Sequence, residues 1–273
     1  STYNVGVNLS TNKGLHYQTM EDLLGASTYH NINTYALGTY ASSSNEVQYD
    51  LNHPNQVISE GDKFGYSYNI FVNKANAWMG YTLDKGIFHS FINAKIGGTN
   101  MQREGKMRNG LAANNSYGKS GTAHFLDGGA KIGTNINMGR GNTIVLGAGY
   151  EWIAPLASTA FASPEINNDF VQNLKCERVF TSEVGYQLET SWLHANINGF
   201  YSRTEDGTEW QNFYFDDINS FSYVSMNNIK KAYYGVEMGL NFKINSAFNI
   251  KAIGTWSDAK NMNNSKVRYM NST

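Results

Sequence analysis

The sequence predicts an all-β protein, namely an antiparallel transmembrane β-barrel segment of about 11 strands that belongs to a larger barrel. Three observations lead to this prediction. Apolar and polar residues alternate with a period of two over many long segments, and short turns alternate regularly with long polar connections. The composition is rich in Gly (27), Tyr (18) and Phe (14) but poor in Pro (3). Aromatic residues favour strands, and proline is excluded where a backbone N–H must donate to a neighbouring strand.

The clearest alternating segment is 231–243. Its odd positions include Lys231, Glu237 and Lys243, whereas its even positions are Ala232, Tyr234, Val236, Met238, Leu240 and Phe242. Successive side chains of a strand point to opposite faces, so one face of this strand is apolar and the other is polar. The pattern recurs at 87–97, 143–152, 179–188 and 192–202. No second element is predicted to cover the apolar faces, and we therefore expect them to contact lipid.

The first predicted strand covers 3–10, where every second residue is apolar. Five strand pairs follow, each joined by a short connection rich in Gly, Asn, Asp or Ser, which are the common turn residues. The pairs are 22–30 with 34–44, 67–83 with 87–99, 121–136 with 142–153, 178–188 with 192–204, and 229–243 with 247–258. Most of these segments reach the roughly 9–11 residues that a tilted strand needs to cross a bilayer.

The connections between successive pairs are long and polar. They cover 45–66, 100–120, 154–177 and 205–228. Bacterial outer-membrane barrels place short turns at the periplasmic end and long loops at the extracellular end, so this alternation favours such a barrel. Aromatic residues gather near the strand ends, as expected at membrane interfaces: Tyr150, Trp152, Tyr201, Tyr234, Phe248 and Trp256.

Charge, cysteine content and hydropathy exclude several classes of protein. The formal net charge of -1 and the pI of about 6.6 give no basic patch for nucleic acid. Cys176 is the only cysteine, so an intrachain disulfide is impossible. The sequence has no run of about 18 apolar residues, and therefore no transmembrane helix is predicted. Residues 1–10 lack the features of a signal peptide and resemble a strand already under way.

The predicted strand count is odd. Single-chain bacterial barrels have even numbers of strands, and a half-barrel would leave two unpaired edges in lipid. We therefore expect the missing partner strands to lie before Ser1 and after Thr273. On this interpretation, residues 1–273 are part of one outer-membrane β-barrel domain.

Several short motifs are similar to those of a known family. The sequence reads QNLKCER at 172–178, and SEVGY follows at 182–186, NGFY at 198–201 and YYGVE at 233–237. FVNKA occupies 71–75, and the aromatic stretch EWQNFYFDD occupies 209–217. In their order and spacing these motifs resemble the TonB-dependent outer-membrane receptors, in particular the SusC-like branch. The resemblance covers most of the chain and is strongest over 164–273.

The resemblance implies a 22-stranded barrel in the outer membrane of a Gram-negative bacterium, plugged by an N-terminal domain that TonB opens. It implies active import of an oligomeric nutrient, an oligosaccharide or a peptide, with a SusD-like surface lipoprotein as partner. No plug domain and no closing strands are recognisable in the 273 residues. The family's plug-borne ligand residues are therefore not assigned to positions of this chain.

The connection 205–228 holds the best candidates for ligand contact. Trp210 and Tyr214 offer aromatic faces that stack on sugar rings or peptide side chains. Asp216 and Asp217 offer carboxylates that accept hydrogen bonds from hydroxyl or amide groups. The alternative is that these aromatic residues are buried, either where the loop folds over the barrel mouth or where it packs on a partner lipoprotein.

No motif supports catalysis, a cofactor or a metal site. The six histidines form no H-E-x-x-H pair and no Cys/His cluster, and no G-x-S-x-G elbow is present. The predicted inward-facing set carries both signs of charge, as expected of a wall that faces a protein plug. Its members are Lys95, Asp127, Lys131, Glu183, Gln187, His194, Glu237 and Lys251. The alternative is a solvated face without a partner.

Three functional hypotheses are compatible with the sequence. The first is an active importer energised by TonB. The second is a passive porin-like or adhesin-like outer-membrane barrel without a plug, and the third is a soluble β-rich binding module. A plug domain encoded ahead of this segment distinguishes the first from the second, and dependence on detergent distinguishes both from the third.

Overall fold

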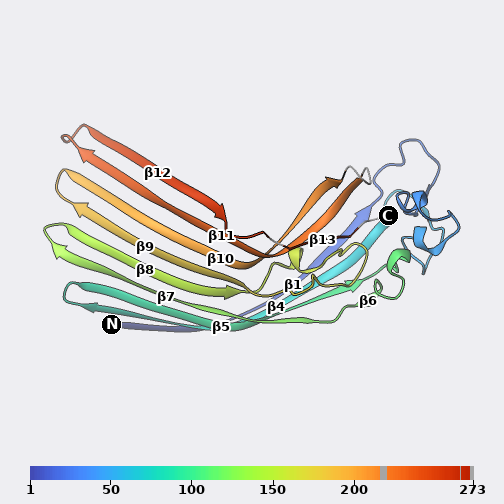
Figure 1. Cartoon of the computed structure of the whole chain (residues 1–273), viewed down its shortest axis with the longest axis horizontal. Coiled ribbons are helices and arrows are strands. Elements are labelled where there is room, and N and C mark those ends of the chain that lie inside the picture. The colour runs from blue at the N-terminus through green and yellow to red at the C-terminus, as the bar shows by residue number, and fades with distance from the viewer. Residues whose placement is uncertain (216–219, 265, 271–273) are drawn as a thin grey trace.

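A computed structural model describes residues 1–215, 220–264 and 266–270, and its main feature is one antiparallel sheet of eleven strands (Figure 1). Nine long strands form its path in the order β1-β4-β5-β7-β8-β9-β10-β11-β12. They are β1 (Thr2–Thr19), β4 (Lys63–Lys85), β5 (Phe88–Gly105), β7 (Ala123–Gly139), β8 (Asn142–Ile153), β9 (Glu177–Glu189), β10 (Leu193–Phe215), β11 (Ser220–Lys243) and β12 (Asn249–Asn261). Within the described residues, β1 and β12 each pair with one neighbour, so the sheet has two open edges.

Shorter elements lie in or beside the long connections. Two short strands extend the sheet, β6 (Gly118–Lys119) beside β5 and β13 (Lys266–Met270) beside β11. Strands β2 (Tyr29–His30) and β3 (Val57–Ile58) form a separate pair. The helical turns are η1 (Ala36–Gly38), η2 (Asn45–Val47), η3 (Gly110–Ala112) and α1 (Ala157–Ala160). No helix in the described part of the chain is long and apolar enough to cross a membrane.

Short turns and long connections lie at opposite ends of the sheet, as the sequence predicts. The turns β4–β5, β7–β8, β9–β10 and β11–β12 lie at the end where the N-terminus begins (Figure 1). The β7–β8 turn places Arg140 and Gly141 at φ 54° and 81°, a left-handed geometry that joins two strands with matching twist. Segments 20–62, 106–122 and 154–176 lie at the other end (Figure 1).

The pairing register gives the sheet one apolar and one polar face. Val7 lies opposite Ala77, which lies opposite Ile96, and equivalent rows continue to Met238 on β11. The side chains of this apolar face are exposed, for example Val5 at 80%, Ile132 at 58% and Val184 at 62%. A continuous exposed apolar surface over nine strands is what a lipid-facing wall requires and what water disfavours.

Aromatic rings border the apolar face at both ends of the strands. Near the long connections, Tyr150 lies opposite Phe180, and Tyr201 lies opposite Tyr234. Near the short turns, Trp192 contacts the ring of Phe242 with centroids 5.4 Å apart. Tyr234 and Phe242 are eight residues apart, about 26 Å along a strand and about 20 Å along the membrane normal for a tilt near 40°, so most of an apolar band about 25 Å tall lies between them.

The predicted strand pair at 22–30 and 34–44 is wrong. This segment forms an irregular connection that contains only the two-residue strand β2 and the turn η1. Asparagine side chains compete there for the backbone: Asn33 Oδ1 accepts from the N–H groups of Tyr35 (3.1 Å) and Ala36 (3.3 Å). Such local hydrogen bonds favour turns over a sheet ladder.

The predicted loop 205–228 is also wrong, because most of it continues β10 and β11 as a long hairpin. Pairing persists from Glu209 with Met226 to Phe215 with Ser220. The register shifts around Gly207, and Asp206 and Asn228 both have a φ of 56° there. Asp and Asn tolerate this left-handed backbone, so the bulge bends the strands without ending them.

The buried core lies at the long-connection end, on the polar face. Phe161 and Ala160 from the connection 154–176 pack with Tyr68 and Ile70 of β4 and Met101 of β5. By register, Tyr68, Ile70 and Met101 share the face that carries the charged residues farther along the strands. The connection 154–176 therefore covers the polar face at one end and leaves the apolar face open.

Candidate functional site

The polar face forms a charged wall, and all eight residues predicted to face inward lie on it. At its centre the Glu151 carboxylate lies 3.3 Å from the amine of Lys95 and 3.5 Å from that of Lys131. In the register, Gly129 lies between Lys95 and Glu151, and a Cβ on Gly129 would be 2.7 Å from Cγ of Glu151. The absence of a side chain at Gly129 lets the ion pair form across a strand.

Arg103 of β5 joins three parts of the chain where this wall meets the long connections. Its side chain is buried, and the residue is 2% exposed. The guanidinium donates to the carbonyl oxygens of Pro164 (2.7 Å) and Ser116 (3.0 Å) and to Oδ1 of Asn168. It also lies 4.9 Å from the ring centroid of Tyr68, a cation–π distance.

Burial changes the protonation of two groups in this cluster. Arg103 donates to neutral oxygens only, and desolvation lowers its pKa to about 10. Glu165, next to Pro164 in the covering connection, is partly buried, and desolvation raises the pKa of its carboxyl. Both groups lie beyond the apolar band. The connection 154–176 thus carries a carboxyl for which the neutral form is favoured.

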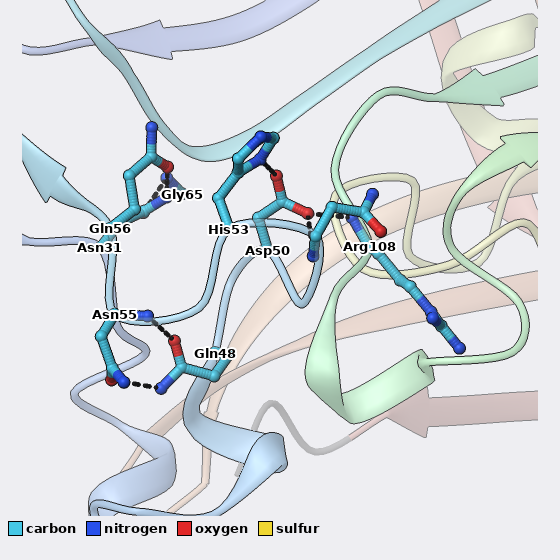
Figure 2. Close-up of polar contacts among 9 residues, drawn as sticks. Asn31, Gln48, Asp50, His53, Asn55, Gln56, Gly65 and Arg108 are labelled. Carbon is cyan, nitrogen blue, oxygen red and sulfur yellow. Dashed lines mark hydrogen bonds and ion pairs between the residues drawn. The ribbon is translucent and has the colours of Figure 1, made fainter.

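The connection 20–62 is organised by polar side chains (Figure 2). The Asp50 carboxylate is buried and accepts from the backbone N–H of Arg108 (2.9 Å), while Nδ1 of His53 lies 2.9 Å away. Gln48 and Asn55 exchange two hydrogen bonds, 2.7 Å and 3.0 Å long. These satisfied polar groups fix a long connection that has almost no regular structure.

The three long connections contact one another and form one assembly. The N–H of Leu51 donates to the carbonyl of Arg108 (2.7 Å), which joins 20–62 to 106–122. The N–H of Asn168 donates to the carbonyl of Asn115 (2.8 Å), and the Asn115 amide donates to Asp169 (2.6 Å). A ligand that approaches from this end of the sheet meets this assembly first.

The four predicted ligand-contact residues belong to the β10–β11 hairpin. Trp210 and Tyr214 lie four residues apart on β10, so they share one face of it, and both are exposed (36% and 48%). Asp216 and Asp217 lie outside the described residues. Contact of these four residues with a ligand stays a prediction.

An ion cluster supports the base of the hairpin. Lys231 of β11 forms an ion pair with Glu209 of β10. Glu177 at the start of β9 is half-buried, and desolvation, followed by repulsion from Glu209, raises the pKa of its carboxyl. The cluster thus links three neighbouring strands where the hairpin leaves the sheet.

Sequence reasoning missed Arg103, Asp50 and Glu165. The predicted strand 87–99 ends too early, because the alternation that marks β5 continues through Thr99, Met101 and Arg103. No comparable signal marks Asp50, because its partners come from the connection 106–122. Among the described residues, no group of three or more His, Cys, Asp or Glu side chains could hold a metal ion.

Solved structures share this fold, among them a copper transporter and a ferric-catecholate import receptor. No family model and no curated protein sequence matches the chain. The copper transporter OprC superposes with a TM-score of 0.64 at 11% identity, over 97% of this chain and 36% of OprC. The ferric-catecholate import receptor Fiu from E. coli K12 superposes with a TM-score of 0.55 at 15% identity, over 96% of this chain and 35% of Fiu.

These comparisons confirm the predicted fold class. The chain spans about a third of the length of OprC and of Fiu. At these identities the likeness shows a shared fold.

Proposed function

We propose that this chain is part of the barrel wall of a TonB-dependent outer-membrane receptor that imports an oligosaccharide or a peptide. The observation that carries the proposal is the two-faced sheet. Its apolar face is exposed across nine strands, its polar face is charged, and its long connections gather at one end. This arrangement suits a wall between lipid and an aqueous lumen.

The open edges support a larger barrel. Strands β1 and β12 each lack a second neighbour among the described residues, and unpaired edges are not tolerated in lipid. OprC and Fiu are each nearly three times as long as the matching region. We infer that further strands of the full-length protein complete the barrel and that a plug domain fills it.

The SusC-like assignment and its cargo rest on the motifs at 172–178, 182–186, 198–201 and 233–237. Exposed aromatic rings on the long hairpin suit contacts with sugar or peptide, and a SusD-like surface lipoprotein is the expected partner at this end. The polar face would contact the plug through paired charges of both signs, such as Glu151 with Lys95.

Uptake by cells that produce the full-length protein tests the proposal. A labelled oligosaccharide or peptide should enter cells with intact TonB and should not enter cells without TonB. Ferric catecholate and copper serve as the alternative cargoes, because the solved relatives import these. Uptake that persists without TonB would indicate a passive pore and would contradict the proposal.

A further inference from the structure

Two hollows lie next to each other along β1 and β4, on the apolar face of the sheet, which is the face away from the charged wall. The hollow nearer to the long connections is called the upper one, and the hollow nearer to Leu9 is called the lower one. The upper hollow has a volume of about 470 Å³, and its lining includes Leu15, Tyr17, Ser67 and Asn69. Leu15 pairs with Asn69, and Tyr17 pairs with Ser67. Leu15 and Tyr17 follow Val5, Val7 and Leu9 at steps of two, so they lie on the apolar face together with their partners on β4. At this end of the strands, that face also carries polar residues.

The lower hollow, of about 250 Å³, lies between the apolar band and the upper hollow. Phe71, Asn73 and Gln102 line it together with Lys119 and Thr122. Lys13 is directly opposite Phe71 in the register, and its amine lies 5.7 Å from the centroid of that ring. The outward face thus changes from apolar to basic and polar within a few residues of Leu9.

The height of the upper hollow excludes an ordinary phospholipid headgroup as its occupant. Tyr17 in the lining of the upper hollow lies four residues beyond Lys13, about 13 Å along the strand, and about 10 Å along the membrane normal for a tilt near 40°. The headgroup layer of a phospholipid bilayer is only about 5–8 Å thick on each side. A lipid that fills both hollows must therefore carry a headgroup that extends well above its phosphate layer.

The lining has the chemistry of a sugar and phosphate site. Lys63 and Lys106 provide amines, the Lys63 amine lying 4.1 Å from the ring centroid of Tyr17 and the Lys106 amine 2.8 Å from Glu104. Asp62, Gln56 and Asn69 provide acceptors and amides for hydroxyl groups. Because cations and carboxylates line it together, the hollow suits a headgroup with many hydroxyls and few charges better than a bare anion.

The roof of the upper hollow is fixed before any ligand binds. Asp50 and His53, which line the hollow, pair with each other, and Asp50 also accepts a hydrogen bond from the backbone N–H of Arg108 (Figure 2). Gln56 accepts from the side-chain amide of Asn31, whose Oδ1 accepts from the N–H of Gly65 (Figure 2). A preformed roof reduces the entropy that binding would cost.

We propose that the two hollows form a binding site for a phosphorylated glycolipid of the outer leaflet. Lys13 and Lys119 hold the phosphate near the membrane, and the upper hollow, with Lys63 and Lys106, holds the sugars beyond it. The inference rests on the proposed membrane orientation but is independent of cargo and of TonB.

The test uses the full-length protein in detergent and two probes, lipid A and a core-bearing lipopolysaccharide, with bound lipid counted by native mass spectrometry. Lys13→Ala with Lys119→Ala should lower the affinity for both probes at least tenfold. Lys63→Ala with Lys106→Ala should lower it only for the core-bearing probe. Lys74→Ala with Lys85→Ala removes the same charge elsewhere and should leave both affinities unchanged.

Footprinting of the wild-type protein removes any dependence on folding of the variants. Bound core-bearing lipopolysaccharide should protect the amines of Lys63 and Lys106 from acylation, and lipid A should not protect them. Equal losses in all three double variants would overturn the proposal, as would tight binding of free sugar phosphate with no binding of either lipid. TonB-dependent import without lipid binding would refute this inference alone, whereas loss of membrane localisation would refute the proposed function as well.

Discussion

The indole ring of Trp78 on β4 lies over Gly6 on the neighbouring strand β1. The two residues are direct partners in the register, and a Cβ built on Gly6 would be 2.6 Å from ring atoms of Trp78. This pair lies on the polar face, and the same arrangement recurs farther along that face, where the ring of Phe91 lies over Gly133 and that of Phe200 over Gly235. Large rings therefore fill the space that strand glycines leave, and these glycines are required by packing.

The first prediction concerns Gly6. Gly6→Val should destabilise the barrel by about 1–3 kcal/mol, because the ring of Trp78 must move to make room for the added side chain. In a Trp78→Ala background the same change should cost less, because the obstacle is gone. Both effects are measured as the shift in the urea midpoint for unfolding of the full-length protein, with the folded fraction read from the gel band of shifted mobility. Gly121→Ala, at a site with nothing within 4 Å, serves as the control, and equal costs of Gly6→Val in the two backgrounds would contradict the packing interpretation.

The second prediction tests which face meets lipid. Met238 and Glu237 are adjacent on β11, both are exposed, and they point to opposite faces. Met238→Arg should cost about 2–4 kcal/mol near the bilayer centre, whereas Glu237→Arg on the wet face should cost much less. Unfolding of the full-length protein from lipid vesicles gives both values. Similar costs for the two variants would mean that the apolar face does not contact lipid.

The third prediction concerns the buried Arg103. Arg103→Met removes the donor shared by Pro164, Ser116 and Asn168 and should release the connection 154–176 from the sheet, at a cost of about 3 kcal/mol or more. Amide hydrogen exchange should rise in 154–176 and 106–122 but not in β10. Arg108→Met, whose side chain donates to Ala113 within its own connection, is the matched control. An exchange pattern common to both variants would remove the special role of Arg103.

The strands of this sheet were predictable because each obeys a local rule. Alternation with a period of two predicts the segments around Ile92, Leu146 and Ile197, and the register confirms the face assigned to each. The pair at 22–44 failed because Asn31 and Asn33 make buried side-chain hydrogen bonds that no period reveals. The prediction of a loop at 205–228 is wrong because its many polar residues indicate a loop, whereas its Thr, Tyr, Phe and Trp residues also favour strands.

The candidate site was predictable only in part. The inward-facing residues follow directly from strand parity, so Glu183 and Lys95 were placed correctly. Contacts between connections, such as Asp50 with Arg108 and Arg103 with Pro164, join residues 58 and 61 positions apart. They depend on how three irregular segments fold against one another, and a single sequence carries no periodic signal for such packing.

The fourth prediction is a pH effect at Glu165. Burial raises the pKa of this carboxyl, so the folded state binds its proton more tightly than the unfolded chain does. This titration therefore stabilises the connection 154–176 as the pH falls from neutral through the raised pKa, and the gain is complete below the ordinary pKa. Amide exchange in 154–176, corrected for its intrinsic rate, should slow as the pH falls from neutral to below the ordinary pKa of a glutamate carboxyl. Glu165→Gln should show the slow exchange already at pH 7 and no further change, and a wild-type connection that loosens on acidification would contradict the assignment.

The fifth prediction concerns the aromatic residues of the hairpin. Trp210 and Tyr214 share one face of β10, and Phe213 points to the other face of the same exposed strand. If the first face contacts the cargo, Trp210→Ala should weaken binding by about 1–2 kcal/mol, or about 5- to 30-fold. Phe213→Ala, which removes a ring of similar size from the opposite face, should change affinity less than twofold. Calorimetry with the transported oligosaccharide or peptide measures both variants. Because both residues lie beyond the membrane band, a matching loss in the two variants would indicate that the rings support the hairpin itself, and the ligand-contact role of Trp210 and Tyr214 would then be wrong.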